Sequence, residues 1–447
     1  PIPPPPPVAS ITLSPPLITL DEGGTATFAA TLRDAAGTVL TGRTIAWSSS
    51  DTTVGTVSSA GTVTGIAEGD TITIRATSEG QSATARVVVL SPYFIATSFS
   101  TQRYHTCAVR ASGGTWCWGD FFHGRLGNPA NTTMGTKMRV ATTEVFVQVA
   151  AGQDNSCALT ATGRAWCWGW SNGGANGDGV ANLGVVQTPT AVVGNLQFVE
   201  IHAGASVACG ITAARLAYCW GLNGNGVLGT GTGAASNPSP QPVVGLLPFG
   251  TYAMQFSHVC GITTSAQALC WGFGGLGNIG DGSFNASRST PTAVSGGRKY
   301  VSIAAGYQHS CAIDDAGAAW CWGKGGFGQL GDGGTGNQFV PVRVSGNAVF
   351  TQVVTGDTHS CALTTAGDTW CWGRNQLGQL GSGSTASSLV PVPVVGAPKF
   401  ARLFAAEVHT CGITSQRRVY CWGNNSFGQL GAAPSTSVNV PTALTRP

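Results

Sequence analysis

Hydrophobic and polar residues alternate along most of this chain with the period of a β-strand, and no stretch has the period of a helix. A representative segment, residues 350–396, reads FTQVVTGDTHSCALTTAGDTWCWGRNQLGQLGSGSTASSLVPVPVVG. Its apolar positions define four short strands, FTQVVT, HSCALT, DTWCWG and VPVPVV, which are separated by turn residues such as the TAG before Asp368. The pattern predicts an all-β fold built from small four-stranded units.

The four-strand segment recurs with a period close to fifty residues, and the cysteines mark this period most clearly. The 14 cysteines form seven pairs, the members of a pair are ten residues apart, and Trp-Gly follows each second cysteine. A fixed period of this length is typical of repeat architectures. The pairs are Cys107 and Cys117, Cys157 and Cys167, Cys209 and Cys219, Cys260 and Cys270, Cys311 and Cys321, Cys361 and Cys371, and Cys411 and Cys421.

Seven such units must bury their apolar faces against one another, because four strands alone cannot form a core. A radial arrangement into a β-propeller achieves this and leaves few sheet edges exposed. A linear solenoid is the alternative, but it would need capping repeats at its ends, and no capping repeat is evident. We therefore predict that residues 93–447 form a seven-bladed propeller.

The spacing within each cysteine pair predicts a disulfide across a hairpin. When Ala366 is placed at the centre of the turn, Cys361 lies opposite Cys371, at the separation that a disulfide requires. Seven zinc sites would need four ligands each, and a reactive thiol would not be needed in seven copies, so we expect neither a metal nor a cofactor. Pairing between neighbouring blades remains the alternative.

A histidine precedes the first cysteine of a pair by two positions in five of the seven repeats. These residues are His105, His258, His309, His359 and His409, whereas the other two repeats have Asn155 and Val207. Because the histidine does not recur in every repeat, we interpret it as a polar residue at a strand edge.

The first 92 residues differ from the rest and contain no cysteine. PIPPPPP, residues 1–7, predicts an extended polyproline arm. Residues 8–92 contain seven or eight alternating strands separated by turn signals, which predicts a β-sandwich of the immunoglobulin type. The sequence begins with Pro1 and not with Met, so we expect that a leader has been removed.

The composition excludes several functional classes. Charged residues make up only 9% of the chain and the net charge is +3, without a basic run that could bind nucleic acid. No segment has the length and hydrophobicity of a transmembrane helix, so we expect no membrane insertion. Paired cysteines throughout the repeats indicate an oxidising compartment, and we expect a secreted or cell-surface protein.

Two families resemble this chain at these residues. Residues 8–90, with TVSSAGTVTGIAEGDTITIRATSEG, resemble the bacterial immunoglobulin-like domains of group 2, which act as spacers and adhesive units on surface proteins. Residues 93–447, with repeats such as HSCALTTAGDTWCWGRNQLGQLG, resemble the regulator of chromosome condensation repeat family. The second resemblance implies a seven-bladed propeller that can serve as a protein-binding disc, but it does not imply nucleotide exchange.

No motif in the chain predicts an active site. Gly323–Gly328 and Gly272–Gly277 match G-x-G-x-x-G, but both follow a strand in the repeat loop and neither opens a helix, so neither predicts dinucleotide binding. We therefore expect a non-enzymatic bacterial structural or adhesive protein that assembles with copies of itself into a surface layer or filament. The alternative is a secreted monomeric module whose propeller face binds a foreign protein or glycan.

Two segments are candidate protein interfaces. Residues 216–280 contain no Asp, Glu, Lys or Arg, and Leu247 and Phe249 in this run predict an exposed apolar patch. The arm is the second candidate, because polyproline loses little conformational entropy when it docks on an aromatic surface. Its predicted contact residues are Pro1, Pro3, Pro4, Pro5, Pro6 and Pro7.

Overall fold

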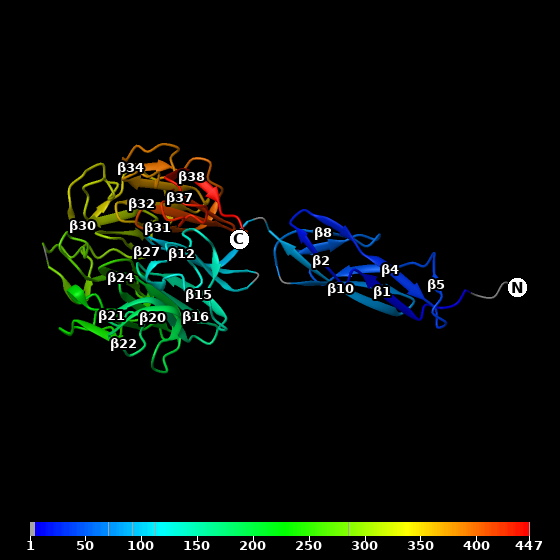
Figure 1. Ribbon diagram of the computed structural model, residues 1–447. Coiled ribbons are helices and arrows are strands. Elements are labelled where there is room, and N and C mark those ends of the chain that lie inside the picture. Colours follow the sequence, from blue (N-terminus) through cyan, green and yellow to red (C-terminus); the bar gives the residue numbers. More distant parts are fainter. Residues whose placement is uncertain (1–4, 70, 92, 112, 285, 447) are drawn as a thin grey trace. The chain divides into compact units, whose positions relative to one another are not determined.

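The computed structural model describes residues 5–69, 71–91, 93–111, 113–284 and 286–446 (Figure 1). The only helical elements in these ranges are two short 3-10 turns, η1 (Phe122–Gly124) and η2 (Gly224–Gly226). No helix of the described residues is long and apolar enough to cross a membrane. The chain divides between Ile95 and Ala96 into two compact units, and the predicted all-β fold of a sandwich followed by a propeller is confirmed.

The first unit is a β-sandwich. Its largest sheet has the order β2-β10-β9-β6, in which β10 runs parallel to β2 and antiparallel to β9. Two smaller sheets have the orders β1-β4-β5 and β3-β8-β7. The strands are β1 (Ser10–Ser14), β2 (Leu17–Asp21), β3 (Thr25–Thr27), β4 (Ala29–Arg33), β5 (Val39–Leu40), β6 (Ala46–Ser49), β7 (Gly55–Val57), β8 (Thr62–Gly65), β9 (Ile72–Ser78) and β10 (Gln81–Leu90).

Alternation along the strands places the apolar side chains inside the sandwich. Val63, Ile74, Val87 and Val89 are fully buried in its core, and Trp47 packs against this core without a disulfide behind it. The sandwich therefore holds its core without a disulfide, unlike the repeats that follow it.

The second unit consists of seven four-stranded antiparallel sheets arranged in a ring (Figure 1). Each blade is formed by four consecutive strands. The first four blades are β11 (Ala96–Thr101), β12 (His105–Arg110), β13 (Thr115–Gly119) and β14 (Met138–Arg139); β15 (Phe146–Ala151), β16 (Asn155–Thr160), β17 (Ala165–Asn172) and β18 (Asn182–Ala191); β19 (Phe198–Ala203), β20 (Val207–Thr212), β21 (Ala217–Leu222) and β22 (Ser236–Pro242); β23 (Phe249–Met254), β24 (His258–Thr263), β25 (Ala268–Gly272) and β26 (Arg288–Ala293).

The remaining three blades follow the same order of strands. They are β27 (Tyr300–Ala305), β28 (His309–Asp314), β29 (Ala319–Gly323) and β30 (Gln338–Arg343); β31 (Phe350–Thr355), β32 (His359–Thr364), β33 (Thr369–Gly373) and β34 (Ser388–Pro393); β35 (Phe400–Ala405), β36 (His409–Thr414), β37 (Val419–Asn424) and β38 (Ser437–Ala443). The first strand of each blade contacts the first strand of the next, and β35 contacts β11, which closes the ring.

The alternating strand directions give the propeller two different faces. One face, here called the hairpin face, carries the tight turns between second and third strands and the links from one blade to the next. The opposite face, the loop face, carries the turns between first and second strands and the long connections from third to fourth strands. No strand of the described residues is exchanged between blades, so the ring closes by packing such as that of Phe99 on Phe404 and by hydrogen bonds such as that from the backbone N–H of Ala96 to the carbonyl of Arg417.

The seven predicted disulfides are all present and all lie within a blade. The register pairs Cys361 with Cys371 and Ala362 with Trp370, and the same register recurs in the other six hairpins. Every cysteine is bonded to the partner ten residues away, so the alternative of pairing between blades is excluded.

Candidate interaction surfaces of the propeller

The tryptophan after each second cysteine joins one blade to the blade before it. All seven of these tryptophans are fully buried, and each donates its Nε1–H to a backbone carbonyl of the preceding blade at 2.8–3.1 Å. In the joint that closes the ring, Trp118 of the first blade donates to the carbonyl of Gln429 in the seventh. The closing joint therefore uses the same bond as the other six.

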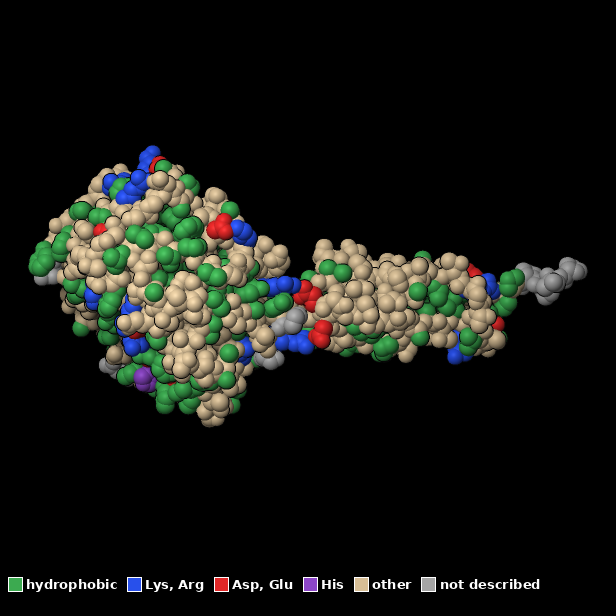
Figure 2. Space-filling model, turned by 90° about the horizontal axis from the view of Figure 1, so that it is seen from above, with side chains coloured by type: hydrophobic (Ala, Val, Ile, Leu, Met, Phe, Trp, Pro, Cys, Tyr) green, Lys and Arg blue, Asp and Glu red, His purple; other side chains and the backbone are tan. Residues whose placement is uncertain are grey.

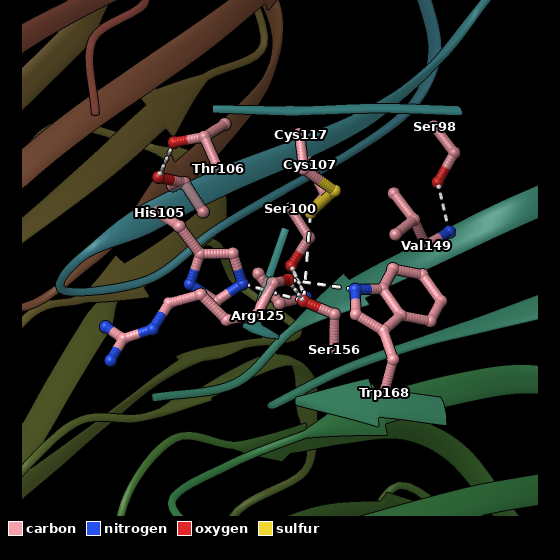
Figure 3. The surroundings of a disulfide bond; sticks show 12 residues. Ser98, Ser100, His105, Thr106, Cys107, Cys117, Arg125, Val149, Ser156 and Trp168 are labelled. Carbon is pink, nitrogen blue, oxygen red and sulfur yellow. Dashed lines mark hydrogen bonds between the residues drawn. A yellow bond between two sulfur atoms is a disulfide. The ribbon is translucent and has the colours of Figure 1, made fainter. Parts of the chain in front are cut away.

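The recurrent histidines lie inside these joints, and their interpretation as strand-edge residues is wrong. Each of the five is fully buried. Figure 3 shows the arrangement between the first two blades, where His105 Nε2 lies 2.7 Å from Ser156 Oγ. Ser156 Oγ in turn donates to the carbonyl of Arg125, which also accepts the bond from Trp168.

The same relay explains why two repeats lack the histidine. His258, His309 and His359 bond to a Ser or Thr of the next blade, and His409 bonds to Thr101, which contacts Thr106. Where the histidine is replaced by Asn155 or Val207, the partner position in the next blade holds Ala208 or Val259. Between Val207 and Val259 both polar partners are lost together, whereas Asn155 is buried opposite Ala208 with its side-chain amide unpartnered among the described residues.

Burial keeps these histidines neutral. It lowers the pKa of His258, His309, His359 and His409 to about 3, and that of His105 well below its usual value. Their Nδ1 atoms have no hydrogen-bond partner among the described residues, so a second proton would be a buried donor without an acceptor. The histidines are therefore structural groups and are not available for proton transfer at a surface.

The first strands of the blades surround a central cup of about 1010 Å³. It opens at the hairpin face between residues such as Val147 and Val199. At the loop face it is closed where Gln255 of the fourth blade donates from Nε2 to Gln102 Oε1 of the first, at 3.4 Å across the ring. A blade-to-blade amide contact also lines the wall, because the Gln148 side chain bonds to both backbone groups of Ile201.

Two charged side chains occupy equivalent positions on distant blades of this cup. Glu200 lies 2.5 Å from Arg215 and 3.5 Å from His202, and these partners, His202 first, hold the pKa of its carboxyl down to about 2. Arg402, from the seventh blade, lies over the ring of Phe404 and takes part in none of the ion pairs of the described residues. The cup can therefore accept a polar ligand, and Arg402 is a cation on its wall that belongs to no ion pair within the described part of the chain.

The loop face carries a half-buried pair of carboxyl groups beside the end of the cup where Gln255 and Gln102 meet. Asp357 and Glu407 come from neighbouring blades, and Arg103 Nε lies 2.7 Å from Glu407 Oε2. Burial and the adjacent Glu407 raise the pKa of Asp357 to about 9, and burial also raises the pKa of Glu407. At neutral pH the pair of carboxyl groups retains a proton. Among the described residues, no group of three His, Cys, Asp or Glu gathers that could hold a metal ion, so the pair has no third ligand there.

Of the two residues of the predicted apolar patch, Leu247 is exposed but Phe249 is not. Phe249 begins β23 and is 1% exposed, because the alternation of that strand turns it into the core beside Trp271. Leu247 belongs instead to a group of seven exposed side chains in the links that lead into the second, third and fourth blades. This aliphatic belt consists of Val145, Val147, Val193, Val199, Val244, Leu246 and Leu247.

The belt lies at the hairpin face, because its residues flank the beginnings of first strands. Its three links, residues 141–147, 192–199 and 243–250, contain only one charged residue, Glu144. Figure 2 shows how few charged side chains appear on the face of the propeller in view, where hydrophobic and uncharged polar atoms are interspersed.

A second exposed apolar surface lies at the loop face between the first two blades, and it interrupts the regularity of the repeats. Trp170 follows the usual Cys-Trp-Gly of β17 and is 38% exposed, whereas the tryptophans of the joints are fully buried. It pairs with Val185 on β18, its ring lies 4.2 Å from that of His123, and Phe122 beside His123 is 53% exposed. We call Phe122, His123, Trp170 and Val185 the aromatic patch.

A buried arginine holds this patch in place. Arg125 occupies the position of Gln329 in the regular GQLG turns, and it is 2% exposed. Its Nη2 lies 2.9 Å from Asp154, its Nη1 lies 3.4 Å from Asp120, and its Nε donates to the carbonyl of Phe122. Asp154 also contacts His123 Nδ1 at 3.0 Å. Arg125 and Asp154 together therefore hold the two neighbouring patch residues, Phe122 and His123.

The polyproline arm leaves the sandwich at the turn between β9 and β10. The backbone N–H of Val8 donates to Glu79 in this turn, and Arg43 Nη2 donates to the carbonyl of Pro6 at 2.5 Å. Pro5, Pro6 and Pro7 are exposed and lie outside any strand. Pro1, Pro3 and Pro4 of the predicted interface fall outside the described residues.

Sequence reasoning missed the joint histidines, Arg125 and the aromatic patch. An alignment of the repeats contains the missing signal. Where one repeat has the histidine, as at His105, the next repeat has Ser or Thr one position after its own equivalent of that histidine, as at Ser156. The patch was signalled by two departures from the repeat, the extra tryptophan of CWGW and the arginine of GRLG.

Comparison with known proteins identifies both units. Residues 266–313, 316–363 and 366–413 match the regulator of chromosome condensation (RCC1) repeat, and a second profile of this repeat matches residues 146–175, 300–329, 350–379 and 408–429. Residues 7–89 match the bacterial Ig-like domain of group 2.

Curated relatives share only part of their length with this chain. The human probable E3 ubiquitin-protein ligase HERC4 is 32% identical over 148 residues, which are 32% of this chain and 14% of the ligase. The mitochondrial RCC1 domain-containing protein RUG3 and the ultraviolet-B receptor UVR8, both from Arabidopsis thaliana, are 29% and 27% identical over 51% of this chain and 53% of their own length.

Solved structures share the propeller fold at low sequence identity. Human WBSCR16 superposes with a TM-score of 0.66 and 20% identity, covering 74% of this chain and 94% of its own. Yeast RCC1 (Prp20), in its complex with Kap60, gives the same TM-score and identity over 75% of this chain and 84% of its own.

Proposed function

We propose that the chain is a non-enzymatic extracellular building block that associates with copies of itself. Residues 96–445 form a propeller, within which residues 146–175 and 266–429 match regulator of chromosome condensation repeats, and it follows a segment that matches the group 2 bacterial Ig-like domain. Seven disulfides fit an oxidising, extracellular location. The bacterial type of the first domain supports a role at a bacterial surface.

The observation that carries this proposal is the aliphatic belt. The polar side chains that recur in the blades are the His, Ser or Thr, and Trp of the joints. They are buried and bonded to one another or to the backbone, so among the described residues this recurring set exposes no polar group at the surface. Seven aliphatic side chains nevertheless remain exposed in the links into the second, third and fourth blades, including Val145 at 75% and Leu246 at 52%. Monomeric proteins rarely expose such a concentration of apolar side chains unless a partner covers it.

The comparisons support a binding role of this general kind. Related propellers bind proteins, as the complex of Kap60 with yeast RCC1 illustrates for that protein. We infer that the partner here is another copy, because the belt is nearly uncharged and an uncharged patch can pair with itself without like-charge repulsion.

A second candidate function is that of a monomeric module that binds a foreign protein or glycan. The central cup favours it, since its volume is that of a ligand pocket and Arg402 is a cation on its wall. Mass measurement separates the two candidates, because only the first requires an oligomer.

The test compares the solution mass of the intact, oxidised chain with that of two double variants, by light scattering over a hundredfold range of concentration and by electron microscopy. Val147→Asp with Val199→Asp places charges in the belt and should yield monomers. Val340→Asp with Leu389→Asp is the matched control, because both residues are about as exposed but lie on fourth strands. A monomeric wild type, or a belt variant that assembles like the wild type, would overturn the proposal.

A further inference from the structure

We propose that Pro1–Pro7 of one copy docks on the aromatic patch of a second copy, with Trp170 as the principal contact. This inference rests on the proposed self-association and names one of its contacts: the donor segment is the polyproline arm and the acceptor is Phe122, His123, Trp170 and Val185.

The acceptor has the chemistry that polyproline recognises. A polyproline II helix has no internal hydrogen bonds and presents flat apolar rings, and proteins bind it on surfaces lined by aromatic side chains. Trp170 and Phe122 supply two exposed aromatic rings, and Val185 extends the surface beside Trp170. His123 adds a polar ring that can bond to carbonyls of the arm.

The acceptor is also held in place before anything binds. Asp154 bonds to His123, the ring of Phe122 stacks on that of Phe121, and the ring of Trp170 packs against that of His123, while Arg125 and the β17–β18 pairing hold the backbone beneath them. A surface whose rotamers are already fixed loses less entropy when a ligand binds. This order distinguishes the patch from a flexible loop that happens to expose aromatic residues.

Within the sandwich, the arm and the exit toward the propeller lie at opposite ends of one strand. The arm leaves the domain beside Glu79, at the start of β10, whereas the chain continues to the propeller from Leu90, at the other end of this ten-residue strand. A strand of that length spans about 30 Å. We infer from this separation that the arm serves a second copy.

An arm-to-patch contact joins two different surfaces and is therefore heterologous. Contacts of this kind form a ring when the rotation closes and an open filament when it does not. The aliphatic belt, in contrast, can pair with its own copy, so the two surfaces make separate contributions that can be removed one at a time.

The experiment measures arm binding separately from assembly. A fluorescein-labelled PIPPPPP peptide is titrated into the chain that lacks Pro1–Pro7, and binding is followed by the anisotropy of the fluorescein. Trp170→Ala should weaken binding about tenfold or more, as for a central contact residue of an interface. Phe284→Ala is the matched control, because Phe284 is a more exposed aromatic residue on another blade and should leave binding unchanged.

The same substitutions are then made in the full chain, where particle length and the melting temperature are recorded. Loss of polymer in Trp170→Ala and in the arm deletion, with an unchanged melting temperature, would support the inference. Peptide that does not bind, or that binds Trp170→Ala as tightly as the parent, would overturn it even if the full chain assembles through the belt. Peptide binding that depends on Trp170 in a chain that stays monomeric would retain the acceptor site but refute its use between copies, together with the proposed self-association.

Discussion

His105 and Ser156 are 51 positions apart in the chain, yet His105 Nε2 lies 2.7 Å from Ser156 Oγ across the joint between the first two blades. This contact closes a chain of hydrogen bonds that runs through the hydroxyl to a carbonyl of the histidine's own blade. The predictions below concern this joint, the staples inside the blades and the groups that titrate between them.

Removing one partner of the joint should cost more than removing both. We expect His105→Ala to lower the free energy of unfolding by about 2–4 kcal/mol, because it leaves a cavity and an incompletely bonded Ser156. The double variant His105→Val with Ser156→Val reproduces the apolar joint that Val207 and Val259 already form in this chain, so its loss should be smaller. Urea unfolding of both variants checks this, and a double variant that is less stable than the single one would contradict it.

Stability should fall in mild acid. A buried histidine whose pKa is lowered on folding binds fewer protons in the folded than in the unfolded state, so its contribution is complete above about pH 6.5 and declines as the pH falls toward 3. Each of the five histidines contributes up to about 1.4 kcal/mol per pH unit in this window. Unfolding measured at pH 7.5, 5.5 and 4.5 tests the slope, which should be shallower in His105→Val with Ser156→Val. An unchanged slope in that variant would show that other groups govern the acid response.

Asp357 should have the opposite effect on stability. Its carboxyl group has a raised pKa of about 9, so the folded chain binds a proton that the unfolded chain releases, and stability falls as the pH rises from about 4 to about 9. We compare the free energy of unfolding of Asp357→Asn with that of the wild type. The difference between the two should shift in favour of the variant by about 1 kcal/mol or more when the pH is raised from 5 to 8. Melting curves at the two pH values provide the test, with the exposed Asp368→Asn as the control that should show no such difference.

The disulfides should act independently of one another. Replacing Cys361 and Cys371 by Ala should cost about 2–3 kcal/mol, because a staple across ten residues restricts the unfolded chain by that amount. Peptide mapping without reduction should recover seven hairpin links in the wild type and the other six in the variant. A link between blades in either protein would contradict the pairing.

The sequence predicted the blades because each blade repeats the same local signals. Cys361 and Cys371 define the hairpin register by their spacing, and Trp372 recurs with them, so the strand pattern and the staples followed from one repeat. Phe249 was placed wrongly because its environment depends on which face of β23 meets Trp271, and hydrophobicity alone does not decide this. The patch around Trp170 depends on contacts between separate blades, such as Arg125 with Asp154, and a single repeat contains only half of each.

The position of the staples has a mechanical consequence. Each disulfide closes a loop inside one blade, and no cysteine links neighbouring blades, so all seven joints rely on packing and hydrogen bonds. Tension applied between Ala96 and Thr445 would therefore open the ring at the joint of Phe99 with Phe404 and then peel blades away one after another. In each released blade, the nine residues between the two cysteines could not extend until the disulfide is reduced, and this segment accounts for about 33 Å of extension. In a filament under load, the propeller would lengthen in seven limited steps, and reduction would lengthen every step.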